Sequence, residues 1–301
     1  MNMIQTDVLI IGAGPAGIQA AIHAARKKVS VLLVGKMSNS AMSGTHIENY
    51  FGLAGTSDGN EILRTGLEQA KSFGCKVSEE NIISSSHEGN VFKLVTENDE
   101  TIEAKSVIIA TGISRKKLGV PGEREFFGKG VSYCASCDCN FYKGKVAMIV
   151  GDETEAAVSA ELMTKYASKV YWVIGNVSAS ENVVKKAEAA GAEIIKGKVE
   201  SINGEGKVNT ATVSGKDYTI DGIFIELGAK SAADLAMDMD LMPEMDDSIK
   251  VKEDCSTDVP GIFACGDITG KPWQVAKAVG QGAVAGISAA DYVRGVKDAD
   301  Q

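Results

Sequence analysis

The chain has 301 residues, of which 44% are hydrophobic and 24% are charged, and its formal net charge at pH 7 is -9. This composition is that of a globular protein long enough for two domains with buried cores. The acidic balance argues against a nucleic-acid partner and against an anionic membrane surface. The first seven residues are polar and lead directly into an apolar strand, which is typical of neither a signal peptide nor a membrane span. We therefore expect a cytoplasmic protein.

A strand, a glycine turn and a helix are predicted at the start of the chain. Asp7–Ile11 is an apolar run typical of a buried strand, and an alanine-rich helix is expected to continue to about Lys27. The turn between them has the spacing G-x-G-x-x-G, in which the second glycine lets a pyrophosphate approach the backbone at the helix N-terminus. The predicted cofactor-binding residues in this turn are Gly12, Gly14, Pro15, Ala16 and Gly17. The next strand, Ser30–Val34, ends at Gly35-Lys36 and lacks the acid that usually holds a ribose hydroxyl.

Two further apolar strands end in motifs that suit the same cofactor. One is Ser106–Ala110 and the other is Gly261–Cys265, near the opposite end of the chain. With the first turn, they resemble the three FAD contacts of flavoproteins that have two dinucleotide-binding domains. The resemblance implies that Asp267 faces the flavin ribityl chain and that a helix from Trp273 to about Arg294 directs its N-terminal dipole at the ring. The predicted contacts after these two strands are Thr111, Gly112, Gly266 and Asp267.

A second unit of the same kind is predicted between these two halves. It comprises a strand at Val146–Val150, a turn at Gly151–Ala156, a helix to about Ser168 and a strand at Lys169–Ile174. The expected fold class is α/β, with two Rossmann-like, three-layer dinucleotide-binding-type domains of which the second is inserted into the first. We expect a discontinuous FAD-binding domain at residues 1–113 and 238–301, an inserted domain at 114–237, and hinges near 113–116 and 228–233.

The run Cys134-Ala135-Ser136-Cys137-Asp138 offers redox chemistry. Two cysteines separated by two residues can close a small disulfide ring, and Asp138 can serve as a proton donor beside it. Half of a zinc site is the alternative, but zinc needs four ligands, and the chain has neither a second C-x-x-C nor a neighbouring histidine pair. We therefore predict no metal and favour exchange of two electrons with a disulfide, for which a reducing compartment is suitable.

The order of these motifs closely resembles that of the low-molecular-weight thioredoxin reductases over essentially the whole chain. The matching segments are His46–Gly52, Gly130–Asp138 and Thr257–Asp267. The resemblance implies a homodimeric FAD protein in which Cys137 lies against the flavin, Cys134 attacks thioredoxin and Asp138 handles protons. It also assigns Asn49, Gln274 and Val275 to the flavin site, with Trp273 in place of the family's arginine.

The second glycine turn departs from the family pattern G-G-G-N-S-A. Its central position is Glu153, flanked by Asp152 and Glu155, so a side chain blocks the approach of a pyrophosphate. One carboxylate facing a phosphate at about 4 Å costs roughly 4 kcal/mol at an effective dielectric near 20. The arginines that hold the 2′-phosphate of NADPH in the family are absent from Gly175–Glu181. An NADH-specific enzyme would not need those arginines, but NADH still carries the pyrophosphate. We therefore expect no NADPH.

Loss of the nicotinamide site beside a retained C-x-x-C resembles the atypical thioredoxin reductases that use reduced ferredoxin or a reduced deazaflavin. Ferredoxins are usually acidic, so a basic docking patch is required, and Arg115-Lys116-Lys117 is the candidate. One alternative is a dithiol oxidase of the same fold that passes electrons to oxygen. The other is a non-catalytic flavin redox sensor.

Four cysteines lie outside the C-x-x-C. Cys75 and Cys265 fall in apolar strand contexts and are expected in the core, whereas Cys255 falls in a polar turn. Cys139 is beside the redox motif, so it either packs or offers an alternative disulfide.

Overall fold

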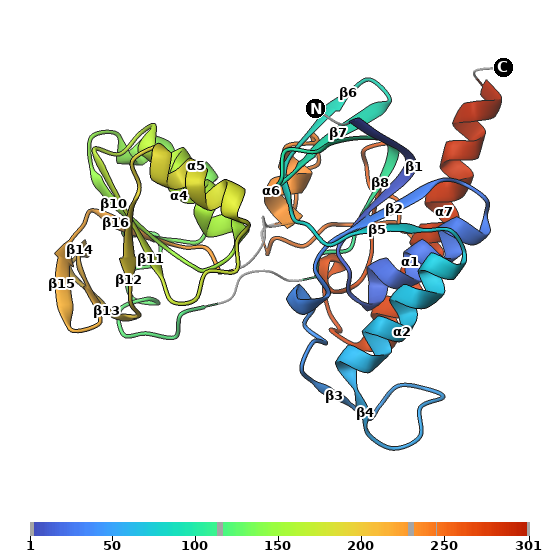
Figure 1. Ribbon diagram of the computed structural model, residues 1–301, viewed down its shortest axis with the longest axis horizontal. Coiled ribbons are helices and arrows are strands. Elements are labelled where there is room, and N and C mark those ends of the chain that lie inside the picture. The colour runs from blue at the N-terminus through green and yellow to red at the C-terminus, as the bar shows by residue number, and fades with distance from the viewer. Residues whose placement is uncertain (1–2, 113–116, 228–231, 245, 300–301) are drawn as a thin grey trace. The chain divides into compact units, whose positions relative to one another are not determined.

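The computed structural model describes residues 3–112, 117–227, 232–244 and 246–299 (Figure 1). The chain divides into two compact units, one formed by Met1–Ile113 with Ser231–Gln301 and the other by Ser114–Lys230. Each unit is an α/β layer structure around a parallel sheet, and the second is inserted into the first, so the predicted fold class is confirmed. The inserted domain was expected to end at residue 237, after helix α6 (Ala232–Met237). The apolar side chains of α6 pack in the core of the first unit, so this helix belongs to the first unit. The expected hinge residues 113–116 and 228–231 lie outside the described part of the chain.

The first unit contains a seven-stranded sheet in the order β5-β2-β1-β8-β7-β6, with β17 also paired to β8. Strand β8 pairs antiparallel with β7 through its first residues and parallel with β17 through its last ones. Since β1, β8 and β17 are parallel, the segments that follow them leave the sheet at one edge. The strands are β1 (Met3–Ile11), β2 (Val31–Val34), β5 (Lys76–Ser78), β6 (Ile82–Glu88), β7 (Val91–Thr96), β8 (Thr101–Ile109) and β17 (Ile262–Ala264), beside a small pair β3 (His46–Ile47) and β4 (Ser57–Asp58).

Both faces of this sheet are buried. Val8 and Ile10 of β1 pack with helices α1 (Pro15–Arg26), α2 (Gly59–Ser72) and α7 (Val275–Ala299), while the alternate residues Leu9 and Ile11 pack on the side of α6. Each fully buried Leu or Ile side chain contributes about 1.5–3 kcal/mol of transfer free energy.

Glycines allow α7 to approach α1 closely. A Cβ on Gly282 would lie 2.2 Å from the Ala16 carbonyl oxygen, and one on Gly286 would lie 2.3 Å from that of Ala20. The C-terminal helix is thereby fixed beside the start of α1, where the first glycine turn lies.

The second unit has three layers. A parallel sheet in the order β12-β11-β10-β16-β9 carries helices on one face and an antiparallel sheet, β13-β14-β15, on the other. Ala147 and Ile149 pack with α4, and the alternate residues Met148 and Val150 pack with the antiparallel sheet. The strands are β9 (Val131–Ser132), β10 (Val146–Val150), β11 (Lys169–Ile174), β12 (Glu193–Lys196), β13 (Val199–Glu205), β14 (Lys207–Val213), β15 (Lys216–Thr219) and β16 (Gly222–Ile225). The α-helices are α3 (Ala135–Asp138), α4 (Thr154–Thr164) and α5 (Glu181–Ala189).

Short 3-10 turns complete the structure: η1 (Met37–Asn39), η2 (Cys139–Tyr142) and η3 (Asp267–Thr269). Among the described helices, none has the length and apolar character needed to cross a membrane.

Candidate active site

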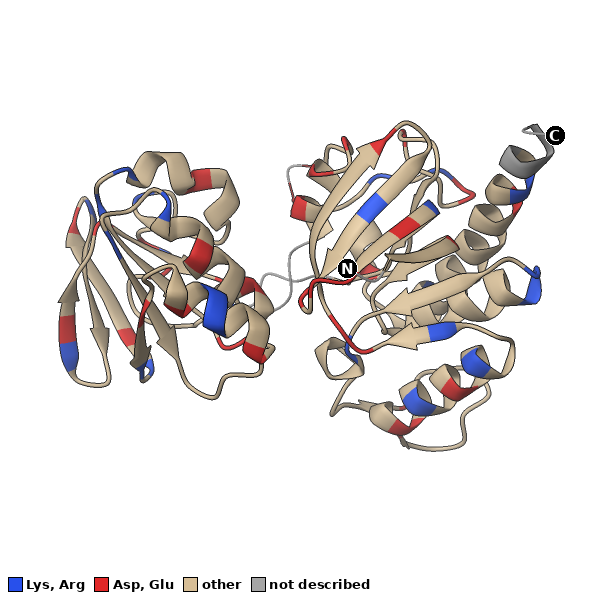
Figure 2. Cartoon of the chain, turned by 45° about the horizontal axis from the view of Figure 1, so that its top comes forward, with Lys and Arg blue, Asp and Glu red and all other residues tan. Residues whose placement is uncertain are grey.

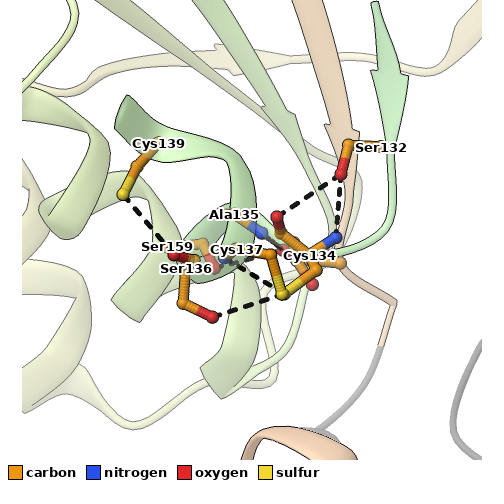
Figure 3. The surroundings of a disulfide bond; sticks show 8 residues. Ser132, Cys134, Ala135, Ser136, Cys137, Cys139 and Ser159 are labelled. Carbon is orange, nitrogen blue, oxygen red and sulfur yellow. Dashed lines mark hydrogen bonds between the residues drawn. A yellow bond between two sulfur atoms is a disulfide. The ribbon is translucent and has the colours of Figure 1, made fainter. Parts of the chain in front are cut away.

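The C-x-x-C motif forms a disulfide in the second unit (Figure 3). Cys134 and Cys137 are bonded, with their Cα atoms 5.4 Å apart. Cys134 is the N-cap of α3, and its sulfur accepts a hydrogen bond of 3.2 Å from the backbone N–H of Cys137. Asp138 is the last residue of the same short helix. The three predicted catalytic residues therefore lie on one helical turn.

Ser132 at the end of β9 orients the first cysteine. Its Oγ accepts from the Cys134 N–H at 3.1 Å and donates to the Cys134 carbonyl at 3.4 Å. Because β9 pairs with β16 as the outermost strand of the parallel sheet, the segment just before the disulfide is fixed to that sheet. Cys134 is buried and Cys137 is exposed. The roles assigned to the two sulfurs remain a prediction.

The other four cysteines are free and buried. Cys75 and Cys265 lie in the core as predicted. Cys255 lies in a turn with φ 63°, but its side chain is buried, and its sulfur contacts the Gln281 carbonyl. Burial raises the pKa of both Cys75 and Cys255 to about 11, so these thiols carry little of the reactive thiolate at neutral pH.

Cys139 packs in the core below α3. Its Sγ donates to the Ser136 carbonyl at 3.5 Å, and it is not part of a disulfide. Figure 3 places its sulfur away from the Cys134–Cys137 bond. Of the two alternatives for Cys139, packing and a second disulfide, the structure supports packing.

The first glycine turn has room for a ligand at one glycine only. A Cβ on Gly12 would lie 2.4 Å from the Ala110 carbonyl oxygen, and one on Gly17 would lie 1.9 Å from that of Gly12, so both are required by packing within the chain. A Cβ on Gly14 would meet only the Ser40 side chain, at 3.4 Å or more. Helix α1 begins with Pro15 at its first position and Ala16 next. The space beside Gly14, at the N-terminus of this helix, fits a pyrophosphate.

Two buried oxygens at the same sheet edge lack partners. Thr111 Oγ1 after β8 and Asp267 Oδ1 after β17 make no hydrogen bond to any described residue. An unsatisfied buried polar atom costs about 1–3 kcal/mol, so a polar ligand group is expected against them. Gly112 and Gly266, with φ of 70° and 85°, make the turns that follow these strands. The residues present therefore fit FAD.

The structure also joins two predicted flavin residues that are far apart in the sequence. Asn49 Nδ2 donates to Gln274 Oε1 at 3.1 Å, immediately before Val275 begins α7. Trp273, which replaces the family's arginine, is 51% exposed, with Lys271 above its ring.

Lys277 is a residue of this site that the sequence did not indicate. Its Nζ donates to the Gly266 carbonyl at 3.1 Å and also to that of Gly270, so it holds both ends of turn η3. Desolvation lowers the pKa of Lys277, while the nearby Asp267 charge opposes that shift. From the sequence, a single lysine near the start of an alanine-rich helix is expected to be solvated. Its bonds to the two carbonyls of the turn become visible only in the folded chain.

An acid does reach the end of β2, although not from the position that the family pattern suggests. Glu97, just after β7, is buried and lies 2.7 Å from Lys36 Nζ. Its Oε1 also accepts from the Asn81 N–H at 3.2 Å. The end of β2 therefore carries an internal ion pair between Lys36 and Glu97.

The Asp267 carboxyl gives a pH prediction for the protein stripped of FAD. Desolvation raises its pKa above the ordinary 3.8, and Lys277 only partly offsets this. The folded state therefore favours the protonated acid, so ionisation destabilises the fold as pH rises above 3.8, and below that value the penalty disappears. We expect Asp267→Asn to raise the unfolding temperature of the stripped protein at pH 7 by a few degrees and to have little effect near pH 3. Thermal unfolding across pH would contradict this if the two proteins behaved alike at pH 7.

The second glycine turn is closed by its own chain. Asp152 Oδ1 accepts from the Gly175 N–H at 2.6 Å, and the Asp152 carbonyl accepts from the N–H groups of Ser178 and Ala179 at 2.8 and 3.1 Å. The segment after β11, where the family has its arginines, is thereby tied onto the turn after β10. Glu153 is the N-cap of α4, at the central position of the turn.

The glycine that remains in this turn has a packing reason. A Cβ on Gly151, whose φ is 154°, would lie 2.1 Å from the Glu226 carbonyl oxygen. The buried Trp172 donates its indole N–H to the Gly151 carbonyl at 2.9 Å. Gly151 therefore serves the close approach of β10 and β16.

Comparison with known proteins agrees with this geometry. A family model described as pyridine nucleotide-disulphide oxidoreductase matches residues 6–282. The thioredoxin reductase of Listeria innocua serovar 6a is 35% identical, over 97% of this chain and 95% of its own. That of Aquifex aeolicus is 32% identical, over 97% and 94%.

Two solved structures are similar over nearly their whole length. The atypical thioredoxin reductase TRi from Desulfovibrio vulgaris Hildenborough gives a TM-score of 0.82 at 32% identity, covering 96% of this chain and 98% of its own. A ferredoxin-flavin thioredoxin reductase from Clostridium acetobutylicum gives 0.69 at 32% identity, covering 99% and 100%. The chain belongs to the pyridine nucleotide-disulphide oxidoreductase family, as a flavin disulfide oxidoreductase of the thioredoxin reductase type.

Proposed function

We propose that this protein is a homodimeric thioredoxin reductase that takes its electrons from a donor other than NADPH. Reduced ferredoxin is the first candidate and a reduced deazaflavin the second. FAD, held at Gly14, Thr111 and Asp267, would supply a carrier of two electrons between the donor and the disulfide. The observation that carries the proposal is the closure of the second glycine turn by Asp152.

A nicotinamide cofactor would need the space that this turn encloses. NADPH and NADH both bind through a pyrophosphate that must approach the turn backbone. Glu153 stands at that approach, and Asp152 is already bonded to the segment that would otherwise hold the adenosine phosphate. Loss of the 2′-phosphate arginines alone would suit NADH, but loss of the pyrophosphate site suits neither cofactor.

Ferredoxin has sufficient driving force for the reaction. A plant-type ferredoxin at about -400 mV and a thioredoxin at about -270 mV differ enough for two electrons to release on the order of 6 kcal/mol. The solved ferredoxin-flavin thioredoxin reductase of Clostridium acetobutylicum is one of the similar structures. The proposal places this chain with such proteins in its choice of donor.

The protein's own residues perform the exchange with thioredoxin. Two electrons break the Cys134–Cys137 bond, leaving two sulfurs that each carry a proton or a negative charge. The Cys134 sulfur then bonds to one thioredoxin sulfur and displaces the other as a thiolate. Cys137 attacks the Cys134 sulfur of this mixed disulfide, which re-forms the internal bond and releases the second thioredoxin sulfur as a thiolate. Asp138, on the same helical turn, moves the protons.

The docking surface for ferredoxin stays a prediction from the sequence. Arg115 and Lys116 lie outside the described residues, and Lys117 is exposed. Figure 2 shows basic and acidic residues interspersed over both units. A local basic patch would thus have to act within a surface of mixed charge.

Anaerobic titration of the bound flavin tests the choice of donor. We expect reduced ferredoxin to bleach the flavin within seconds, and NADPH or NADH at micromolar concentration to leave it oxidised over minutes, at least 100-fold slower. Reduced deazaflavin is run beside them, with dithionite as the positive control. Rapid bleaching by NADPH would overturn the proposal.

Two further measurements separate the other functions. Many turnovers of thioredoxin per flavin exclude a non-catalytic sensor. A dithiol oxidase would instead consume oxygen with a small dithiol and would not need ferredoxin.

A further inference from the structure

A buried acid is hydrogen-bonded to the backbone next to the redox disulfide. Glu226 follows strand β16 and is 6% exposed. Its Oε1 accepts a hydrogen bond of 2.8 Å from the backbone N–H of Ala135, the residue that follows Cys134, and one of 3.4 Å from Ser159 Oγ on α4. A short run of covalent bonds joins the Ala135 nitrogen to the Cys134 sulfur. The sulfur therefore lies within roughly 7 Å of the Glu226 carboxylate.

The contacts of Glu226 suit a negative charge. Both groups at Oε1 are donors, and donation to a carboxylate stabilises its ionised form. The Ala135 N–H opens helix α3, where a free amide would otherwise help to stabilise a thiolate. In its ionised form, which the two donors favour and burial opposes, Glu226 occupies this amide and brings a like charge in its place.

Other titratable groups surround α3 in the same unit. They are Asp138 on α3, Cys139 and Tyr142 on η2, Tyr166 after α4, Tyr133 with its partner Glu123, and Glu153 and Glu155 in the first turn of α4. Burial raises the pKa of Tyr142, and a hydrogen bond with Cys139 raises that of Tyr166, so both tyrosines are neutral near pH 7. Asp138, Glu153 and Glu155 are partly exposed, so water and salt screen their charges. Glu123, like Glu226, is buried, but the groups that donate to its carboxylate are the N–H groups of Leu118 and Gly119 and the Tyr133 hydroxyl, which all lie outside α3. Among the described residues of this unit, Glu226 is the buried acid bonded to α3 itself.

We propose that Glu226 is a positioning residue whose buried charge makes the reduced Cys134–Cys137 dithiol a stronger electron donor. The inference concerns the disulfide itself and rests on the proposed function only in naming thioredoxin as the acceptor.

The charge of Glu226 acts differently on the two redox states of the cysteine pair. The disulfide is uncharged, so Glu226 does not affect it through charge. Reduction adds two electrons, breaks the S–S bond and needs two protons, unless one sulfur stays as a thiolate. A carboxylate nearby disfavours that thiolate, so the reduced form gains less stabilisation and gives up its electrons more readily. A dithiol whose reduced form is stabilised is, conversely, an oxidant.

The test compares Glu226→Gln with the wild-type holoprotein in mixtures of reduced and oxidised dithiothreitol. Glutamine keeps the length and an oxygen acceptor for the Ala135 N–H, and it removes the charge. At about pH 9, above the ordinary thiol pKa of about 8.5, we expect the disulfide of the variant to be reduced at a dithiothreitol ratio on the order of tenfold lower, because the reduced form there carries the thiolate on which the charge acts. We also expect the pH profile for alkylation of Cys134, followed by peptide mapping, to move to lower pH.

Controls separate charge from structure. Glu155→Gln removes a partly exposed acid of α4 and should leave both measurements unchanged. Flavin content and thermal unfolding report whether Glu226→Gln is folded, and Glu226→Met, of similar length, is the second variant if it is not. An unchanged equilibrium in a folded variant would overturn the inference, as would a wild-type Cys134 that is already a thiolate well below pH 7.

The outcome is independent of the electron donor. Dithiothreitol reduces the disulfide directly, so a protein that proved to use NADPH would leave this test intact. A negative result here would likewise leave the donor proposal standing.

Discussion

Replacing Cys137 with serine is expected to abolish turnover and to turn the protein into a trap for thioredoxin. Cys134 would still attack the thioredoxin disulfide, but no second thiol would resolve the product. With a thioredoxin that lacks its own resolving cysteine and carries thionitrobenzoate in a disulfide on the remaining one, Cys134 displaces the thionitrobenzoate thiolate, and the mixed disulfide should accumulate to nearly one per active site. Turnover should fall by at least about 10³-fold, since the two sulfurs act as one unit. Non-reducing electrophoresis and intact mass measure the adduct.

The matched variant Cys134→Ser decides the roles of the two sulfurs. If only this variant traps thioredoxin, the assignment is reversed. Since Cys134 is buried and Cys137 exposed, trapping through Cys134 would also mean that the pair rearranges during turnover. Cys139→Ser is the control, because the Cys139 sulfur bonds to the Ser136 carbonyl away from the disulfide, and near wild-type turnover is expected.

The fold could be predicted because its signals are local. Apolar runs such as Val146–Val150 specify buried strands, and the glycines of the first turn are fixed by contacts that any such turn makes. Gly12 and Gly17 would clash with backbone atoms of the same unit if they carried a Cβ. Strand, turn and helix therefore follow from spacing alone.

The details of the second unit could not be predicted in the same way. The sequence indicated a blocked turn from Glu153 and the missing arginines, but it did not indicate that Asp152 ties the following segment down. Glu226 is separated from Ala135 by 91 positions, and no motif marks it. Long-range contacts of this kind depend on which strands are neighbours, here β16 beside β9, and on side-chain directions that only the folded chain defines.

The two glycine turns differ at the position that a pyrophosphate must approach, and a substitution can make the first turn resemble the second. We expect Gly14→Val to fold and yet to weaken FAD binding on the order of 100-fold or more. Gly14 has φ -89° and ψ -178°, which valine adopts readily, and its Cβ would meet only the Ser40 side chain. The added side chain therefore fills the ligand space without displacing the protein backbone.

Flavin absorbance per protein after purification, and titration of FAD into the stripped protein, measure the effect. The unfolding temperature of stripped Gly14→Val should stay within a few degrees of the stripped wild type, whereas Gly12→Val should lower it strongly, because its Cβ would lie 2.4 Å from the Ala110 carbonyl oxygen. Glu153→Gly, the reverse change in the second turn, should leave FAD content unaltered. A Gly14→Val protein that retained a full complement of FAD would show that the cofactor does not approach this turn, and the flavin site would then have to be sought elsewhere in the first unit.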